Sequence, residues 1–157
     1  MLPSIVSHIQ RLDNLFQIAS RVSDPREQSE WAKYLCILVS GLIESSLRNL
    51  IEDYCQKKSS PNVSRYALRD IDRLTNCKTG KIHSTLESFD AQWALDFNSN
   101  MNSQSRMPEE LFNSINSVIS NRHIFAHGGS AGMSLGNITK FYHDTKKVIL
   151  ILDSIIK

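Results

Sequence analysis

The sequence is poor in several features that would point to a secreted, metal-binding or disordered protein. Its three cysteines, Cys36, Cys55 and Cys77, form no CxxC pair and leave one over, which is typical of reduced structural thiols in a cytosol. Only four prolines are present, and 41% of the residues are hydrophobic, as in a folded domain. The formal net charge of +2 gives weak support to a nucleic-acid partner, so any cationic site must be local.

The chain also lacks clear targeting, membrane-spanning and nucleotide-binding signals. The start, MLPSIVSHIQ, has no basic region followed by an apolar run, so we expect no signal peptide and a cytoplasmic protein. The apolar stretches YLCILVSGLI and VILILDSII are about half the length of a membrane span, which predicts no membrane partner. The glycine-rich HGGSAGMSLG lacks the GxGxxG and GxxxxGK patterns and follows no strand, which argues against a phosphate-binding loop.

What is present is helical periodicity, because no segment alternates with a period of two and no internal repeat is visible. A chain of 157 residues is the size of one domain. Apolar spacing and capping residues predict long helices over 3–22, 25–57, 108–127 and 135–156, shorter helices over 63–74 and 79–97, and a loop over 98–106. The predicted fold class is all-α, an up-and-down bundle of four main helices with short helices in the middle of the chain.

The second predicted helix has the pattern of an enclosed core helix. Asp24, Pro25 and Glu27 form a strong helix start. The apolar residues that follow cover more than half of the helix circumference, so other helices are expected to surround it. Glu44 lies in the middle of this otherwise apolar stretch.

One arginine lies where an apolar residue is expected. In SVISNRHIFAHGG, residues 117–129, Arg122 falls near the centre of the apolar arc of its helix. Burying an unpaired guanidinium costs several kcal/mol. Arg122 is therefore either paired inside the core, with Glu44 as the natural candidate, or placed to meet an anion or a second subunit.

Two histidines accompany this arginine. His123 and His127 flank the same arc, and His127 stands at the helix C-terminus, where the macrodipole attracts cations. The planar fork of an arginine suits phosphate oxygens. Cleavage of RNA through its own 2′-hydroxyl needs a base, an acid and positive charge near the phosphate. The group therefore has the residue types that this reaction requires.

Two segments carry a resemblance to a known superfamily. The run RHIFAH, residues 122–127, resembles the Rx4-6H motif of HEPN domains, with His123 in the polar position after the arginine. The run SGLIESSLRNLI, residues 40–51, is similar to their buried second helix with its acidic residue. The wider likeness, to RiboL-PSP-type and related HEPN proteins, covers roughly residues 30–156 by helix order and spacing.

The resemblance implies a metal-independent endoribonuclease that needs no cofactor and acts as a homodimer on RNA, as a toxin or antiviral defence effector restrained by an antitoxin or regulatory protein. In that reading His127 is the acid or base, Arg122 binds phosphate, and His123 is an auxiliary polar group. Glu44 would orient Arg122, and Asn121 is a further supporting candidate. The family also contains members that bind without cutting, so a module that binds RNA, a nucleotide or a protein partner stays open.

Other readings of the histidines are weaker. His123 and His127 have the i, i+4 spacing of a helical zinc pair, but Ile124 stands where a metalloprotease needs glutamate, and no third ligand is signalled. The sequence therefore predicts no metal site.

A cationic strip is a second candidate for RNA contact. Arg65, Arg69 and Arg73 recur every four residues, which suits RNA phosphates, although the interleaved Asp70 and Asp72 slightly favour a solvated helix face. The aromatic residues that could stack on bases are more often core residues at helical spacing; they are Tyr66, Trp93 and Tyr142.

Overall fold

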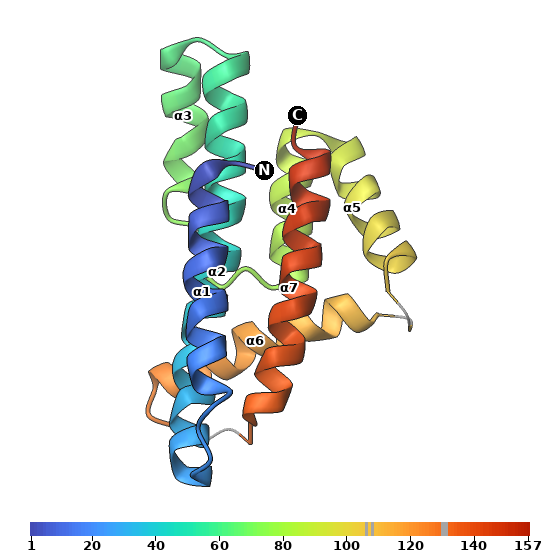
Figure 1. Ribbon diagram of the computed structural model, residues 1–157. Helices are drawn as coiled ribbons and strands as arrows, with labels where there is room; N and C mark the ends of the chain where they lie inside the picture. Colours follow the sequence, from blue (N-terminus) through green and yellow to red (C-terminus); the bar gives the residue numbers. More distant parts are fainter. Residues whose placement is uncertain (106, 108, 130–131) are drawn as a thin grey trace.

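The protein folds into helices throughout the part of the chain that the computed structural model describes, residues 1–105, 107, 109–129 and 132–157 (Figure 1). The described helices are α1 (Pro3–Ala19), α2 (Pro25–Lys58), α3 (Pro61–Ile71), α4 (Thr79–Phe89), α5 (Ala91–Ser103), α6 (Glu110–Ala126) and α7 (Leu135–Ile155). The predicted all-α class is confirmed, with four longer helices and three short ones between α2 and α6.

Helix α2 is the central element of the bundle. The carboxylate of Asp24 caps its start by accepting the N–H groups of Arg26 and Glu27 at 2.7 and 3.1 Å. Most of its apolar residues from Ala32 to Cys55 are buried, because α1, α3, α6 and α7 pack around it, whereas Tyr34 and Ile37 are exposed. Among the described residues α2 alone has the length and apolar composition of a membrane span. Of its most apolar 18-residue stretch, 56% is buried inside the protein.

The middle of the chain differs from the prediction. The helix expected over 79–97 is two helices, because Asp90 ends α4 and its side chain caps α5 by accepting the N–H of Gln92 at 2.7 Å. The loop expected over 98–106 is wrong for residues 98–103, which continue α5. Phe97 and Met101 are fully buried one turn apart, so their packing outweighs the preference of the neighbouring Asn and Ser residues for loops.

Helix ends differ from the prediction by a few residues, as is usual for boundaries placed from sequence. The first helix ends at Ala19 rather than at residue 22, and α6 is described from Glu110. Pro108, expected to open α6, and Arg106, at the end of the expected loop, lie outside the described residues.

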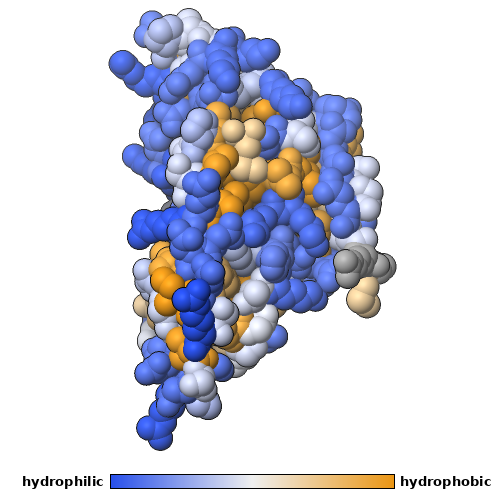
Figure 2. Space-filling model, in the orientation of Figure 1, coloured by the Kyte–Doolittle hydropathy of each residue, from blue (hydrophilic) through white to orange (hydrophobic). Residues whose placement is uncertain are grey.

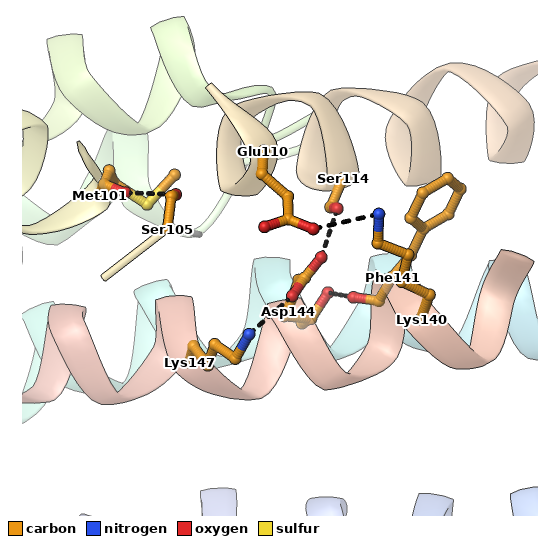
Figure 3. A network of polar contacts seen from close by, with 9 residues as sticks. Met101, Ser105, Glu110, Ser114, Lys140, Phe141, Asp144 and Lys147 are labelled. Carbon is orange, nitrogen blue, oxygen red and sulfur yellow. Dashed lines mark hydrogen bonds and ion pairs between the residues drawn. The ribbon is translucent and has the colours of Figure 1, made fainter. Parts of the chain in front are cut away.

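Polar contacts fix α6 against α7 (Figure 3). The hydroxyl of Ser114 donates to the carboxylate of Asp144 at 2.6 Å, and the ammonium of Lys147 donates to the same carboxylate at 3.0 Å. Asp144 is only 3% exposed. Glu110, the first residue of α6, forms an ion pair with Lys140 of α7 at 3.1 Å. These contacts fix the position of α6 along α7, and so help to place the residues at its C-terminal end.

We expect Ser114→Ala to lower the free energy of unfolding by about 1–3 kcal/mol, because a buried carboxylate loses a hydrogen-bond donor. Urea denaturation followed by circular dichroism measures the change. Ser117→Ala is the matched control, because the Ser117 hydroxyl makes no hydrogen bond within the described residues. Equal stability of the two variants would contradict a structural role for the Ser114–Asp144 contact.

Candidate active site

Helix α6 leaves the core at its C-terminal end. It crosses the N-terminal half of α2, where the Cys36 thiol donates to the carbonyl of Val118 at 3.4 Å, and its last turn emerges on the other side (Figure 1). Val118 and Ile119 are buried, Arg122 is half-buried, and His123 and His127 are exposed. The apolar arc predicted from the sequence therefore passes from core to solvent at Arg122.

Two glycines end α6 directly after His127. The N–H of Gly128 donates to the carbonyl of Phe125 at 3.1 Å, and the N–H of Gly129 donates to that of Ile124 at 2.9 Å, the paired bonds of a Schellman cap. Gly128 has a φ of +74°, which favours glycine. A Cβ on Gly129 would lie 2.6 Å from the Cγ2 atom of Ile124. The glycines thus allow the sharp turn that leaves His127 exposed.

Asn76 connects Arg122 to Glu44. A terminal nitrogen of the Arg122 guanidinium donates to the side-chain oxygen of Asn76 at 3.3 Å. The carboxylate of Glu44 accepts the main-chain N–H of Asn76 at 2.7 Å. Glu44 therefore contacts the arginine's partner, and within the described residues no ion pair joins Arg122 to a carboxylate. The direct salt bridge considered from the sequence is not the arrangement seen.

Asn76 is not among the site residues predicted from the sequence, and the signal in the sequence that points to it is weak. Asn76 has a φ of +54°, in the left-handed region that asparagine tolerates better than most residues. An asparagine in the polar link TNCKTG is consistent with such a turn, but nothing in the sequence connects it to Arg122 46 residues later.

The loop around Asn76 is anchored at both ends. Arg48 donates to the carbonyl of Leu74 at 3.3 Å, and the main-chain N–H of Thr79 donates to the side-chain oxygen of Asn116 at 2.9 Å. Between them Cys77 is fully buried. Burial raises the pKa of its thiol to about 12, and the negative charge of Glu44 acts in the same direction, so Cys77 packs as a neutral group.

The guanidinium of Arg122 has more donors than partners. An arginine side chain carries five N–H donors, and within the described part of the chain the side chain of Arg122 makes a single hydrogen bond, to a neutral amide. Its positive charge is therefore not neutralised by a contacting carboxylate there. Such a cation at the edge of a core is suited to an anionic ligand.

The two histidines lie together on one side of α6. The ring centroids of His123 and His127 are 4.5 Å apart, with the planes at 67°. Positions 122 and 127 are about 140° apart around a helix, so one chain presents Arg122 and His127 in different directions. Asn121, the other supporting candidate, donates to the carbonyl of Ser117 at 2.8 Å within α6. In the part of the chain that the structure describes, no group of three or more His, Cys, Asp or Glu side chains is gathered as for a metal ion.

The other candidates lie apart from this group or inside the core. Helix α3, which carries Arg65 and Arg69, packs beside the C-terminal half of α2, whereas α6 crosses the N-terminal half (Figure 1). Arg65, Arg69 and Arg73 are exposed, with Arg69 3.6 Å from Asp70.

Of the three aromatic candidates for base stacking, only Tyr66 is exposed. Trp93 is buried, and the single O–H donor of the buried Tyr142 is shared between the carbonyl of Ile9 at 3.1 Å and the carboxylate of Asp13 at 2.9 Å. Trp93 and Tyr142 are therefore core residues, as their helical spacing favoured.

A hollow of about 570 Å³ lies near the chain ends, far from α6. Figure 2 shows hydrophobic side chains at the surface in this upper region, between α2 and α7. Its charged groups are largely paired with one another: the N-terminal amine with Asp153 at 3.0 Å, and Lys57 with Asp53 at 2.7 Å. It has no histidine in its walls, and we do not place the reaction there.

Comparison with known families gives one result that covers almost the whole chain. The family model described as RiboL-PSP-HEPN matches residues 3–157. Comparisons with curated proteins and with solved structures give no match.

Proposed function

Because the chain belongs to the RiboL-PSP-HEPN family, we propose that it is a metal-independent endoribonuclease that acts as a homodimer. HEPN domains are often ribonucleases or otherwise RNA-related, and they commonly bind RNA and dimerise. The observation that carries the proposal is the half-buried Arg122, whose described side-chain contact is one neutral amide. A guanidinium held in this way can bind a phosphodiester without first breaking an ion pair.

The reaction uses the 2′-hydroxyl of the RNA as its nucleophile. A histidine takes the proton of this hydroxyl, the O2′ atom forms a bond to phosphorus, and the bond from phosphorus to the 5′ oxygen breaks. A second histidine gives a proton to the leaving 5′ oxygen. The products carry a 2′,3′-cyclic phosphate and a 5′-hydroxyl. His127 takes one of the two proton-transfer roles, while Arg122 stabilises the negative charge that develops on the phosphorane.

A second copy of the chain would supply what one copy lacks. Two-fold symmetry doubles both residues and lets the His127 of one copy face the Arg122 of the other. Exposed apolar side chains near the site support such a contact. Tyr34 and Ile37, 45% and 43% exposed, share one stripe of α2 with Glu44 by helical spacing.

We expect the purified protein to cleave single-stranded RNA in excess EDTA and to leave 2′,3′-cyclic phosphate ends. Arg122→Ala and His127→Ala should each lower the rate at least about a hundredfold, because each removes charge stabilisation or proton transfer from the transition state. Gel assays with end-group analysis measure both effects.

His143→Ala is the matched control, because His143 is an exposed histidine on α7, outside the motif. This variant should cleave RNA like the native protein. Sedimentation should find dimers at the assay concentration. RNA binding without any cleavage by the native protein would contradict the enzyme and favour the non-catalytic module.

Asn76 is proposed as a positioning residue for Arg122. Asn76→Gly tolerates the φ of +54° and keeps the N–H that Glu44 accepts, but it removes the acceptor of the guanidinium. We expect kcat to fall about tenfold to a hundredfold with little change in KM, because the arginine would be misplaced in the transition state.

Asn76→Asp is the paired variant, because it keeps a side-chain oxygen for Arg122 but adds a charge with which a phosphate must compete, so KM should rise. Thermal unfolding checks that Asn76→Gly remains folded. If Asn76→Gly cleaves at the native rate, Asn76 does not position the arginine.

We propose further that this activity serves a toxin or an antiviral defence effector, which a protein partner restrains. An unrestrained cut in cellular RNA stops translation, so expression in a bacterial host should arrest growth. Arg122→Ala or His127→Ala should relieve the arrest at equal protein levels, as measured by growth curves and blotting. If the variants arrest growth as strongly as the native protein does, the toxicity does not come from the proposed site.

A further inference from the structure

A pocket lies against the motif and is not used by the reaction described above. Its volume is about 360 Å³. One wall comes from the last two turns of α6 and the other from the loop before α4; the lining residues are Asn76, Lys78, Ile119, Ser120, His123 and Ile124.

The pocket adjoins both halves of the candidate active site. Asn76 lines it and is also the residue that accepts the hydrogen bond from Arg122. His123 lines it and its ring is 4.5 Å from that of His127. A phosphodiester held by Arg122 would therefore place an attached nucleotide at the mouth of this pocket.

The walls offer apolar surface for a flat ring. Ile119 and Ile124 contribute branched aliphatic side chains, and His123 contributes an exposed imidazole. Bases of single-stranded RNA bind proteins by stacking on aromatic rings and by packing their faces on such surfaces. A nucleobase is therefore the part of the substrate that fits these walls.

The polar groups at the rim are mainly donors. The side-chain oxygen of Asn76 already accepts from Arg122, so its amide nitrogen remains as a donor. The ammonium of Lys78 carries three donors and makes no hydrogen bond or ion pair to residues that the structure describes. The hydroxyl of Ser120 and the imidazole of His123 can both donate and accept, and the amide oxygen of Asn76 has a second lone pair besides the one that Arg122 uses.

The excess of donors selects between bases. Uracil presents carbonyl oxygens, and guanine presents O6 and N7 as acceptors, whereas adenine presents an amino donor beside N7. An amino group directed at Lys78 would leave donors facing donors, and unpaired polar groups are costly to bury. We propose that this pocket binds the base next to the scissile phosphate and favours a keto base, uracil or guanine, over adenine.

This inference rests on the proposed nuclease activity and is tested with substrates that contain one cleavable bond. DNA oligonucleotides with a single ribonucleotide are made with each base in turn on either side of that bond. At one of the two positions, substrates with uracil or guanine should be cut about tenfold faster than those with adenine. Lys78→Met should remove this preference by slowing only the keto substrates.

Lys81→Met is the matched control, because Lys81 is an exposed lysine one turn further along α4 and does not line the pocket. It should keep the preference. Equal rates for all four bases at both positions, or a preference that survives Lys78→Met, would overturn the inference while leaving the nuclease proposal in place.

A binding measurement separates the pocket from the chemistry. Uridine 3′-monophosphate, titrated into isotope-labelled protein, should shift the NMR signals of the loop around Lys78 and of the last turns of α6 more than adenosine 3′-monophosphate does. This result in a protein that cuts no RNA would keep the pocket and reject the nuclease. Equal shifts from the two nucleotides would reject the base preference.

Discussion

The hydrogen bond from the main-chain N–H of Asn76 to the carboxylate of Glu44, 2.7 Å long, is the contact on which the candidate site depends. Glu44 is half-buried in the middle of α2, the helix on which α1, α3, α6 and α7 pack. By holding the main chain of Asn76, it fixes the side chain that receives Arg122 and one wall of the adjacent pocket. The half-buried Glu44 thus holds a loop that contacts Arg122, which lies more than seventy residues after Glu44 in the chain.

The end of α6 requires both burial and exposure within two turns. Val118 and Ile119 anchor the helix in the core, and the Ser114–Asp144 contact fixes its position against α7. Past Arg122 only Phe125 still packs partly against the core, and the two glycines end the helix directly after His127. The histidines consequently stand on a rigid support while their rings remain accessible, a combination that a longer or a more deeply buried helix would not give.

The sequence predicted the parts of this structure that depend on local patterns. Helical periodicity and the Asp24 cap located α2, and the misplaced Arg122 marked the candidate site. The loop predicted for the second half of α5 was wrong, because Asn and Ser favour loops locally while the burial of Met101 depends on helices distant in the chain. Asn76 was missed for the same reason, since its contacts are to residues 32 positions before it and 46 positions after it.

The chemical types at positions 44 and 76 determine how much charge Arg122 can offer to a ligand. A carboxylate in direct contact would orient the guanidinium but would also neutralise it, and a phosphate would then compete with a built-in anion. A neutral amide accepts one N–H without cancelling the charge, and the acid instead accepts the main-chain N–H of the same asparagine. Orientation and charge are thereby assigned to different groups. This division explains why an acidic residue in the middle of the central helix is compatible with an arginine that binds anions.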